Sequence, residues 1–163
     1  MLADRFHNIT PVAAVEIEAY PQRVLAKRFP SIGIWDDVRT FRADNSECRE
    51  AFAWLRGHAN ELVVAGGFPC QDISAAGKGS GIEGERSGLW REFARVLCEI
   101  RPQWAFVENS PLLVGRGLQR VLGDLASMRY DAWWEVLGAS ELGAMHKRER
   151  IWITARLADT KSQ

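Results

Sequence analysis

The segment that decides the fold is Glu61-Leu-Val-Val-Ala-Gly-Gly-Phe-Pro-Cys-Gln71, a short apolar run followed at once by glycine, proline and cysteine. The apolar run has the length of a buried strand in a parallel sheet. The two glycines let the backbone turn sharply and approach a ligand closely, and Pro69 fixes the backbone before Cys70. A cysteine in such a turn is a candidate nucleophile if its surroundings lower the thiol pKa, although most free cysteines are small buried hydrophobes.

Outward from this segment, short apolar runs alternate with amphipathic stretches along the whole chain. The pattern predicts strands over 11–17, 32–38, 61–65, 103–107, 132–137 and 150–155, and helices over 20–28, 47–58, 89–100 and 118–128. The length of 163 residues is room for one domain. Alternating strands and helices of these lengths predict a doubly wound α/β domain, with a mostly parallel sheet and helices on both faces.

Composition excludes several classes of protein. The chain is 47% hydrophobic and 26% charged, which is typical of neither disorder, collagen nor a coiled coil. No apolar run approaches the roughly 20 residues of a membrane span, and the first residues do not resemble a secretory leader, so we expect a cytoplasmic protein without a membrane partner. Cys48, Cys70 and Cys98 lie too far apart for a disulfide framework or a zinc site, and we expect no metal. The 21 basic and 21 acidic residues cancel, which argues against a large nucleic-acid footprint.

Doubly wound sheets bind their ligands just beyond the carboxyl ends of the strands. Four positions follow predicted strands in this way: Glu16, Asp37, the 68–71 turn, and Glu108 with Asn109. A carboxylate at Glu108 would stand above the sheet edge, where it could transfer a proton. The structural alternatives are a helix cap or a loop salt bridge, and spacing alone does not decide between them.

A glycine-rich segment, residues 74–88, follows the cysteine turn. It fails as a phosphate-binding P-loop, because Asp72 stands where that motif needs glycine and Gly79 where it needs serine or threonine. A long polar loop beside a cysteine is typical of a functional lid.

A second charged segment, Lys147-Arg148-Glu149-Arg150, precedes the last predicted strand. As a charge run alone it would be a solvated hairpin. Strand alternation, however, places Arg148 and Arg150 on the same side.

Taken in order, these motifs resemble those of the DNA cytosine-5 methyltransferases. Gly66-Gly-Phe-Pro-Cys-Gln71 is similar to the catalytic Pro-Cys motif of that family. Glu108-Asn109 resembles its Glu-Asn-Val motif, with Ser110 in place of valine, and Arg148-Glu-Arg150 resembles its Arg-x-Arg motif. The resemblance implies a Rossmann-like core, S-adenosylmethionine as cofactor and double-stranded DNA as substrate.

The resemblance also implies a role for each matching residue. Cys70 would add to C6 of a flipped-out cytosine, so that C5 can accept the methyl group. Glu108 would hydrogen-bond N3 and the exocyclic amine, Arg150 would contact O2, and Arg148 would help to position the site. The cofactor would be bound by Glu16 (ribose), Ile17 (adenine), Asp37 and Val38 (the adenine amino edge), and Pro69 and Leu89 (the methionine side). The DNA would be contacted by Gln71, Ser74, Lys78 and Arg86.

The sequence departs from the family at both ends. No Phe-x-Gly-x-Gly loop precedes the first strand, and only residues 158–163 follow the last one. We therefore expect 1–157 to be a partial catalytic domain, incomplete at both ends, and 158–163 to be a tail that begins the missing recognition region. A truncated gene, half of a split enzyme or an excised fragment would each give this chain. We expect its activity to be impaired unless another chain supplies the missing parts.

Two other classes of function stay open at this stage. The first is a non-catalytic methyltransferase remnant that binds a partner or nucleic acid. The second is a thiol-redox or nucleotide-binding α/β protein, which lacks support because the sequence has no Cys-x-x-Cys and no Gly-x-Gly-x-x-Gly after a strand.

Overall fold

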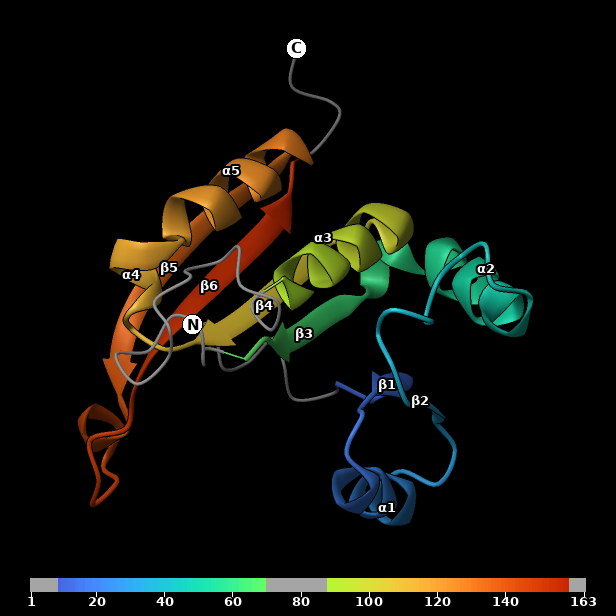
Figure 1. The fold of residues 1–163 in the computed structure, drawn as a ribbon, viewed down its shortest axis with the longest axis horizontal. Coiled ribbons are helices and arrows are strands. Elements are labelled where there is room, and N and C mark those ends of the chain that lie inside the picture. Colours follow the sequence, from blue (N-terminus) through green and yellow to red (C-terminus); the bar gives the residue numbers. More distant parts are fainter. Residues whose placement is uncertain (1–8, 70–87, 159–163) are drawn as a thin grey trace. The chain divides into compact units, whose positions relative to one another are not determined.

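The computed structural model describes residues 9–69 and 88–158. The chain divides into two compact units, Met1–Arg49 and Glu50–Gln163, and each is described by itself (Figure 1). Among the described residues, no helix has the length and apolar character needed to cross a membrane.

The first unit is a small β-α-β arrangement. Its elements are β1 (Ala13–Val15), α1 (Ala19–Arg28), β2 (Gly33–Trp35) and the short helix η2 (Ser46–Cys48). The strands β1 and β2 are parallel, with Ala13 opposite Gly33 and Val15 opposite Trp35. Both strands are shorter than the sequence predicts, because the chain turns away from the ladder directly after each of them. After β1, the Glu16 carboxylate accepts a hydrogen bond from the backbone N–H of Glu18 at 2.8 Å.

The second unit is built on a four-stranded sheet in the order β3-β4-β6-β5. Its elements are α2 (Arg49–Gly57), which starts at the boundary, then η3 (Ala59–Glu61), β3 (Val63–Gly67), α3 (Leu89–Ile100), β4 (Trp104–Asn109), α4 (Leu113–Arg116), α5 (Leu118–Ser127), β5 (Tyr130–Gly138), η5 (Ala139–Leu142) and β6 (Glu149–Leu157). The strands β3, β4 and β5 run in one direction. Only β6, between β4 and β5, is reversed.

The expectation of an α/β fold with a mostly parallel sheet is confirmed, and the reversed strand is an addition to it. Strands β5 and β6 are joined by residues 139–148. A parallel return needs a crossover of a dozen or more residues, so this connection is too short for one and produces antiparallel pairing. The hairpin brings the start of β6 to the carboxyl end of β4, and this pairing positions the candidate site.

The core lies between the sheet and the helices α3 and α5, which lie over the sheet in Figure 1. Along β4 the buried residues alternate, with Ala105, Val107 and Asn109 facing the core. The indole N–H of Trp90 on α3 donates to the Asp124 carboxylate on α5 at 2.8 Å and joins the two helices. Burying each large apolar side chain in this layer contributes about 1.5–3 kcal/mol to stability. The core consists of Phe68, Trp90, Leu97, Ala105, Val107, Leu113, Leu118, Val121, Leu125, Tyr130, Ile151, Ile153 and Ala155.

Candidate active site

The glycine pair lies inside β3 rather than in a turn, so the sharp turn expected at these residues is wrong. Other atoms do lie close to both glycines, as expected, but these atoms belong to the protein and not to a ligand. A Cβ at Gly67 would lie 2.9 Å from the backbone oxygen of Glu108 and 3.1 Å from its Oε2 atom. A Cβ at Gly66 would lie 2.9 Å from the Phe93 ring. Gly67 therefore gives the Glu108 carboxylate its place beside the strand that leads to Cys70.

Asn109, the last residue of β4, is 2% exposed and hydrogen-bonded through both the nitrogen and the oxygen of its amide. Its Nδ2 donates to the backbone oxygen of Phe68 at 3.0 Å, and its Oδ1 accepts from the backbone N–H of Ser110 at 2.7 Å. One amide thus ties the end of β4 to the backbone two residues before Cys70. The sequence motifs alone predict no separate role for this side chain. A buried amide at a strand end, beside the loop of the neighbouring strand, is the signal that points to one.

Glu108 and Arg150 form an ion pair, with the Nε atom of Arg150 2.6 Å from Oε1 of Glu108. Both side chains are partly exposed, at 35% and 30%. The contact follows from strand register, because Asn109 lies opposite Ile151 and thereby sets Arg150 at the same edge as Glu108. An exposed ion pair of this kind stabilises a fold by only about 0–1 kcal/mol, so its main effect is to orient the carboxylate.

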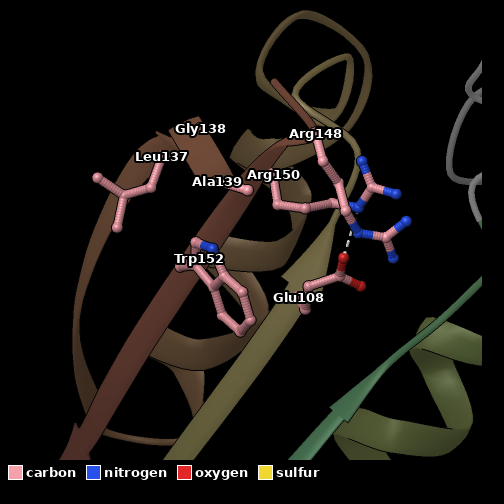
Figure 2. Close-up of a pocket in the computed structure, with 7 residues that line it drawn as sticks. All are labelled: Glu108, Leu137, Gly138, Ala139, Arg148, Arg150 and Trp152. Atoms are coloured by element: carbon pink, nitrogen blue, oxygen red, sulfur yellow. Dashed lines mark ion pairs between the residues drawn. The ribbon is translucent and has the colours of Figure 1, made fainter. Parts of the chain in front are cut away.

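Arg148 and Arg150 line the same pocket, and Figure 2 shows both guanidinium groups near the Glu108 carboxylate. Arg148 lies just before β6, so the hairpin, and not the strand alternation used in the prediction, places it there. Arg148 has a backbone φ of 32°, a left-handed conformation that residues other than glycine adopt at a cost. The backbone of the preceding residue is tied down, because the N–H of Ala139 donates to the oxygen of Lys147 at 2.7 Å. The base of the hairpin thus holds Arg148 in this conformation.

These charged groups line a pocket of about 390 Å³ at the edge of β4, β5 and β6 (Figure 2). This volume is within the range of small-molecule binding sites. Three of its lining residues are predicted from the sequence motifs, and the others, most notably Trp152, are not. Trp152 lies directly opposite Glu108 in the β4–β6 register. Its position two residues after Arg150 on an alternating strand is the signal that points to it. The pocket is lined by Glu108, Leu137, Gly138, Ala139, Arg148, Arg150 and Trp152.

The predicted cofactor residues of the first unit follow its two parallel strands. Glu16 and Asp37 come one and two residues after β1 and β2, and so lie at the same edge of this small sheet. The Asp37 carboxylate accepts hydrogen bonds from the Arg39 side chain at 2.8–3.0 Å, and these bonds lower its pKa. Ile17 is 63% exposed. Ile17 directly follows Glu16, so the end of β1 offers a carboxylate and an exposed apolar side chain to a ligand.

The remaining predicted residues are placed in part. Pro69 follows β3, and Leu89, the first residue of α3, packs against the edge of the core. Val38 adjoins Asp37 in the turn after β2. The residues expected to attack the base and contact DNA lie outside the described residues: Cys70, Gln71, Ser74, Lys78 and Arg86. Among the described residues, no group of three or more histidine, cysteine or acidic side chains could hold a metal ion.

The fold resembles those of solved methyltransferase structures. It superimposes on a mutant DNMT2 of Spodoptera frugiperda with a TM-score of 0.71 at 16% identity, covering 98% of this chain and 46% of that chain. It also superimposes on the S. pombe Dnmt2 methyltransferase with a TM-score of 0.68 at 18% identity, covering 99% and 47%.

Sequence comparison gives the family. Residues 3–163 match the C-5 cytosine-specific DNA methylases, and the chain belongs to this family. It is 32% identical over 148 residues to the Type II methyltransferase M.CviJI of Paramecium bursaria Chlorella virus IL3A, covering 90% of this chain and 37% of the relative. It is 29% identical over 150 residues to the Type II methyltransferase M2.BsuMI of Bacillus subtilis, covering 87% and 35%. The chain thus spans about a third of the length of these relatives.

Proposed function

We propose that the chain carries the catalytic centre of an enzyme that methylates C5 of cytosine in DNA. The observation that carries this proposal is the Glu108 carboxylate, which Arg150 orients at the end of β4 beside the strand that leads to Cys70. The family supports the reaction type, and the pocket at Glu108 has the size of a site for one small molecule or base.

The protein's task in this reaction is to make a weakly nucleophilic carbon attack an electrophile. The Cys70 thiolate would form a bond to C6 of the cytosine and push the C5–C6 electron pair toward C5. S-adenosylmethionine would supply an electrophilic methyl group: C5 would attack this carbon while the S–CH3 bond breaks, and the sulfur would keep that electron pair and leave as S-adenosylhomocysteine. Removal of the C5 proton by a base then returns an electron pair to the ring, and the Cys70–C6 bond breaks to release the thiolate.

Glu108 and Arg150 would recognise cytosine and stabilise the ring while Cys70 is attached. One Glu108 oxygen is engaged by Arg150, and the other lies beside Gly67 at the end of β3. A carboxyl group there is suited to hydrogen-bond N3 and the exocyclic amine, and the Arg150 guanidinium is suited to donate to O2. Arg148 would hold the pocket rim. The target base must leave the duplex to reach this site.

The first unit would bind the adenosyl part of the methyl donor. Glu16 and Asp37 supply carboxylate oxygens, which suit ribose hydroxyls and an amine, and the exposed Ile17 suits the face of an adenine ring. Val38, Pro69 and Leu89 complete the proposed set. Gln71, Ser74, Lys78 and Arg86 stay proposed DNA contacts. We also propose that methylation by this chain increases when a second chain supplies a glycine loop and a recognition domain.

The test is covalent trapping at Cys70. The chain, with and without the complementing segments of a relative such as M.CviJI, is incubated with S-adenosylmethionine and DNA that contains 5-fluorocytosine, whose fluorine blocks the final elimination. We expect an adduct that survives denaturation and that Cys70→Ser abolishes. Cys98→Ser, which changes an exposed cysteine on α3, is the matched control and should keep the adduct. An adduct retained in Cys70→Ser would overturn the proposed nucleophile. The absence of any adduct would favour a remnant that binds without catalysis.

A further inference from the structure

Trp152 is the aromatic side chain among the seven residues that line the pocket. It is 44% exposed, although it lies in the middle of β6. In the sheet register it stands opposite Glu108 of β4 on one side and Glu135 of β5 on the other. Figure 2 shows its indole and the Glu108 side chain on the same side of the sheet, with the Glu108 carboxylate turned toward the arginine side chains. An aromatic side chain exposed at the rim of a charged pocket is accessible to a ligand that enters the pocket.

The pocket offers the two kinds of contact that a nucleobase needs. A base has a polar edge and two flat apolar faces. Glu108, Arg148 and Arg150 can bind the edge with charge-assisted hydrogen bonds. Of the other lining residues, Leu137, Gly138 and Ala139 have no aromatic side chain, so among the described residues the indole of Trp152 is the aromatic surface against which a base in this pocket could stack.

We propose that Trp152 is the stacking surface for the cytosine bound at Glu108, and so determines how firmly the extruded base is held. This inference rests on the proposed function, because it takes the pocket as the place of the target base. Bases extracted from a duplex are held in this way, by hydrogen bonds at the edge and by stacking on side chains at the face.

Trp133 is the internal comparison for this proposal. It lies on the neighbouring strand β5, opposite Thr154, and therefore on the same face of the sheet as Trp152. It is also exposed, at 57%, but it does not line the pocket. Replacing Trp133 thus removes an equal aromatic surface from the same face, without touching the candidate site.

The experiment compares Trp152→Leu, Trp152→Phe and Trp133→Leu with the unchanged chain. One readout is transfer of labelled methyl groups to mixed genomic DNA, with KM for DNA and kcat measured separately. The other is equilibrium binding of a single-stranded deoxycytidine oligonucleotide. Trp152→Leu should raise KM and weaken oligonucleotide binding about 5- to 150-fold, which corresponds to the ~1–3 kcal/mol of one stacked base. Trp152→Phe keeps a π face. Its loss of oligonucleotide-binding free energy should therefore be less than about a third of the loss in Trp152→Leu. Trp133→Leu should match the unchanged chain.

The two proposals fail in different ways. If the unchanged chain, alone or complemented, transfers no methyl groups, the proposed function is contradicted. The binding of the oligonucleotide would then be the test of the stacking role of Trp152. The stacking role is overturned if Trp152→Leu binds the oligonucleotide as tightly as the unchanged chain, or if the unchanged chain does not bind it. The stacking role would also be overturned if Trp152→Leu and Trp152→Phe lose the same oligonucleotide affinity, or if Trp152→Leu and Trp133→Leu do.

Discussion

Asn109 holds two segments of backbone with one side chain, and its burial makes both bonds costly to lose. In Asn109→Ala the backbone oxygen of Phe68 and the N–H of Ser110 would each lose a partner. An unsatisfied buried polar group costs about 1–3 kcal/mol, so we expect Asn109→Ala to lower the free energy of unfolding by at least about 2 kcal/mol in urea titrations.

The neighbouring Ser110→Ala is the control for Asn109. Its hydroxyl accepts a long bond, 3.4 Å, from the backbone N–H of Leu112, and its loss should cost less than about 0.5 kcal/mol. Equal stabilities of the two variants would show that the Asn109 bonds do not hold the backbone at Phe68 and Ser110 in place.

Glu108 differs from Asn109, because its role should appear in the rate and hardly in stability. The side chain is about one third exposed, and its ion pair with Arg150 is worth at most about 1 kcal/mol. Glu108→Gln keeps the shape but removes the charge. We expect it to unfold at nearly the same urea concentration as the unchanged chain and to slow methyl transfer by about 10²-fold or more. Unchanged turnover in a folded Gln variant would exclude Glu108 from the chemistry.

At the scale of elements, Gly67 and Gly123 test why β3 ends in glycine. A Cβ at Gly67 would lie 2.9 Å from the Glu108 backbone, whereas one at Gly123, within α5, meets nothing within 4 Å. We therefore expect the same substitution, glycine to alanine, to change the free energy of unfolding in opposite directions at the two positions. Gly67→Ala should destabilise the fold by about 1–3 kcal/mol, because backbone must shift. Gly123→Ala should stabilise it by about 0.5–1 kcal/mol, because alanine favours a helix. Thermal unfolding measures both, and a neutral Gly67→Ala would contradict the packing argument.

The start of β5 gives a prediction about alkaline pH. The Tyr130 hydroxyl donates to the backbone oxygen of Pro102 at 2.8 Å, and burial raises the pKa of Tyr130 to about 12. The folded state thus keeps this proton where the unfolded chain, with a pKa near 10, releases it. The contribution of the protonated Tyr130 hydroxyl to the free energy of unfolding is therefore complete below pH ~10 and is lost as the pH rises toward 12. Tyr130→Phe should flatten this part of the stability curve, whereas Tyr20→Phe, at an exposed tyrosine, should leave it unchanged.

The same elements show what periodicity can and cannot predict. The helix over 89–100 is predicted to the residue, because its apolar face and its end are local properties. The strand over 150–155 is also found, but its direction depends on the length of the hairpin before it and not on its own pattern. Trp152 was missed because its importance comes from lying opposite Glu108. That register is set by pairing between segments some forty residues apart, which alternation along one strand does not contain.

At the scale of the whole molecule, the two units differ in how much apolar surface they bury. Among the described residues of the first unit, Phe41 and Cys48 are the buried apolar side chains. The second unit buries a continuous core beneath α3 and α5, centred on residues such as Leu97 and Ile153. Since apolar burial is the main source of stability, the two units should not open with the same free energy.

Hydrogen exchange measured by mass spectrometry tests this difference. Amides of β1 and β2 should open with a smaller free energy and exchange at least about tenfold faster than those of β4 and β6, since every ~1.4 kcal/mol of opening free energy is a factor of ten.

S-adenosylmethionine, if it binds Glu16 and Asp37 as proposed, should slow exchange in the first unit and leave the β4–β6 pairing almost unchanged, because a ligand stabilises only the state that binds it. Asp37→Asn should reduce that protection, and Asp44→Asn, an exposed acid in the same unit whose side chain pairs with Arg42, should not. Uniform exchange across both units would contradict the burial argument, and protection that persists in Asp37→Asn would remove this carboxylate from the cofactor site.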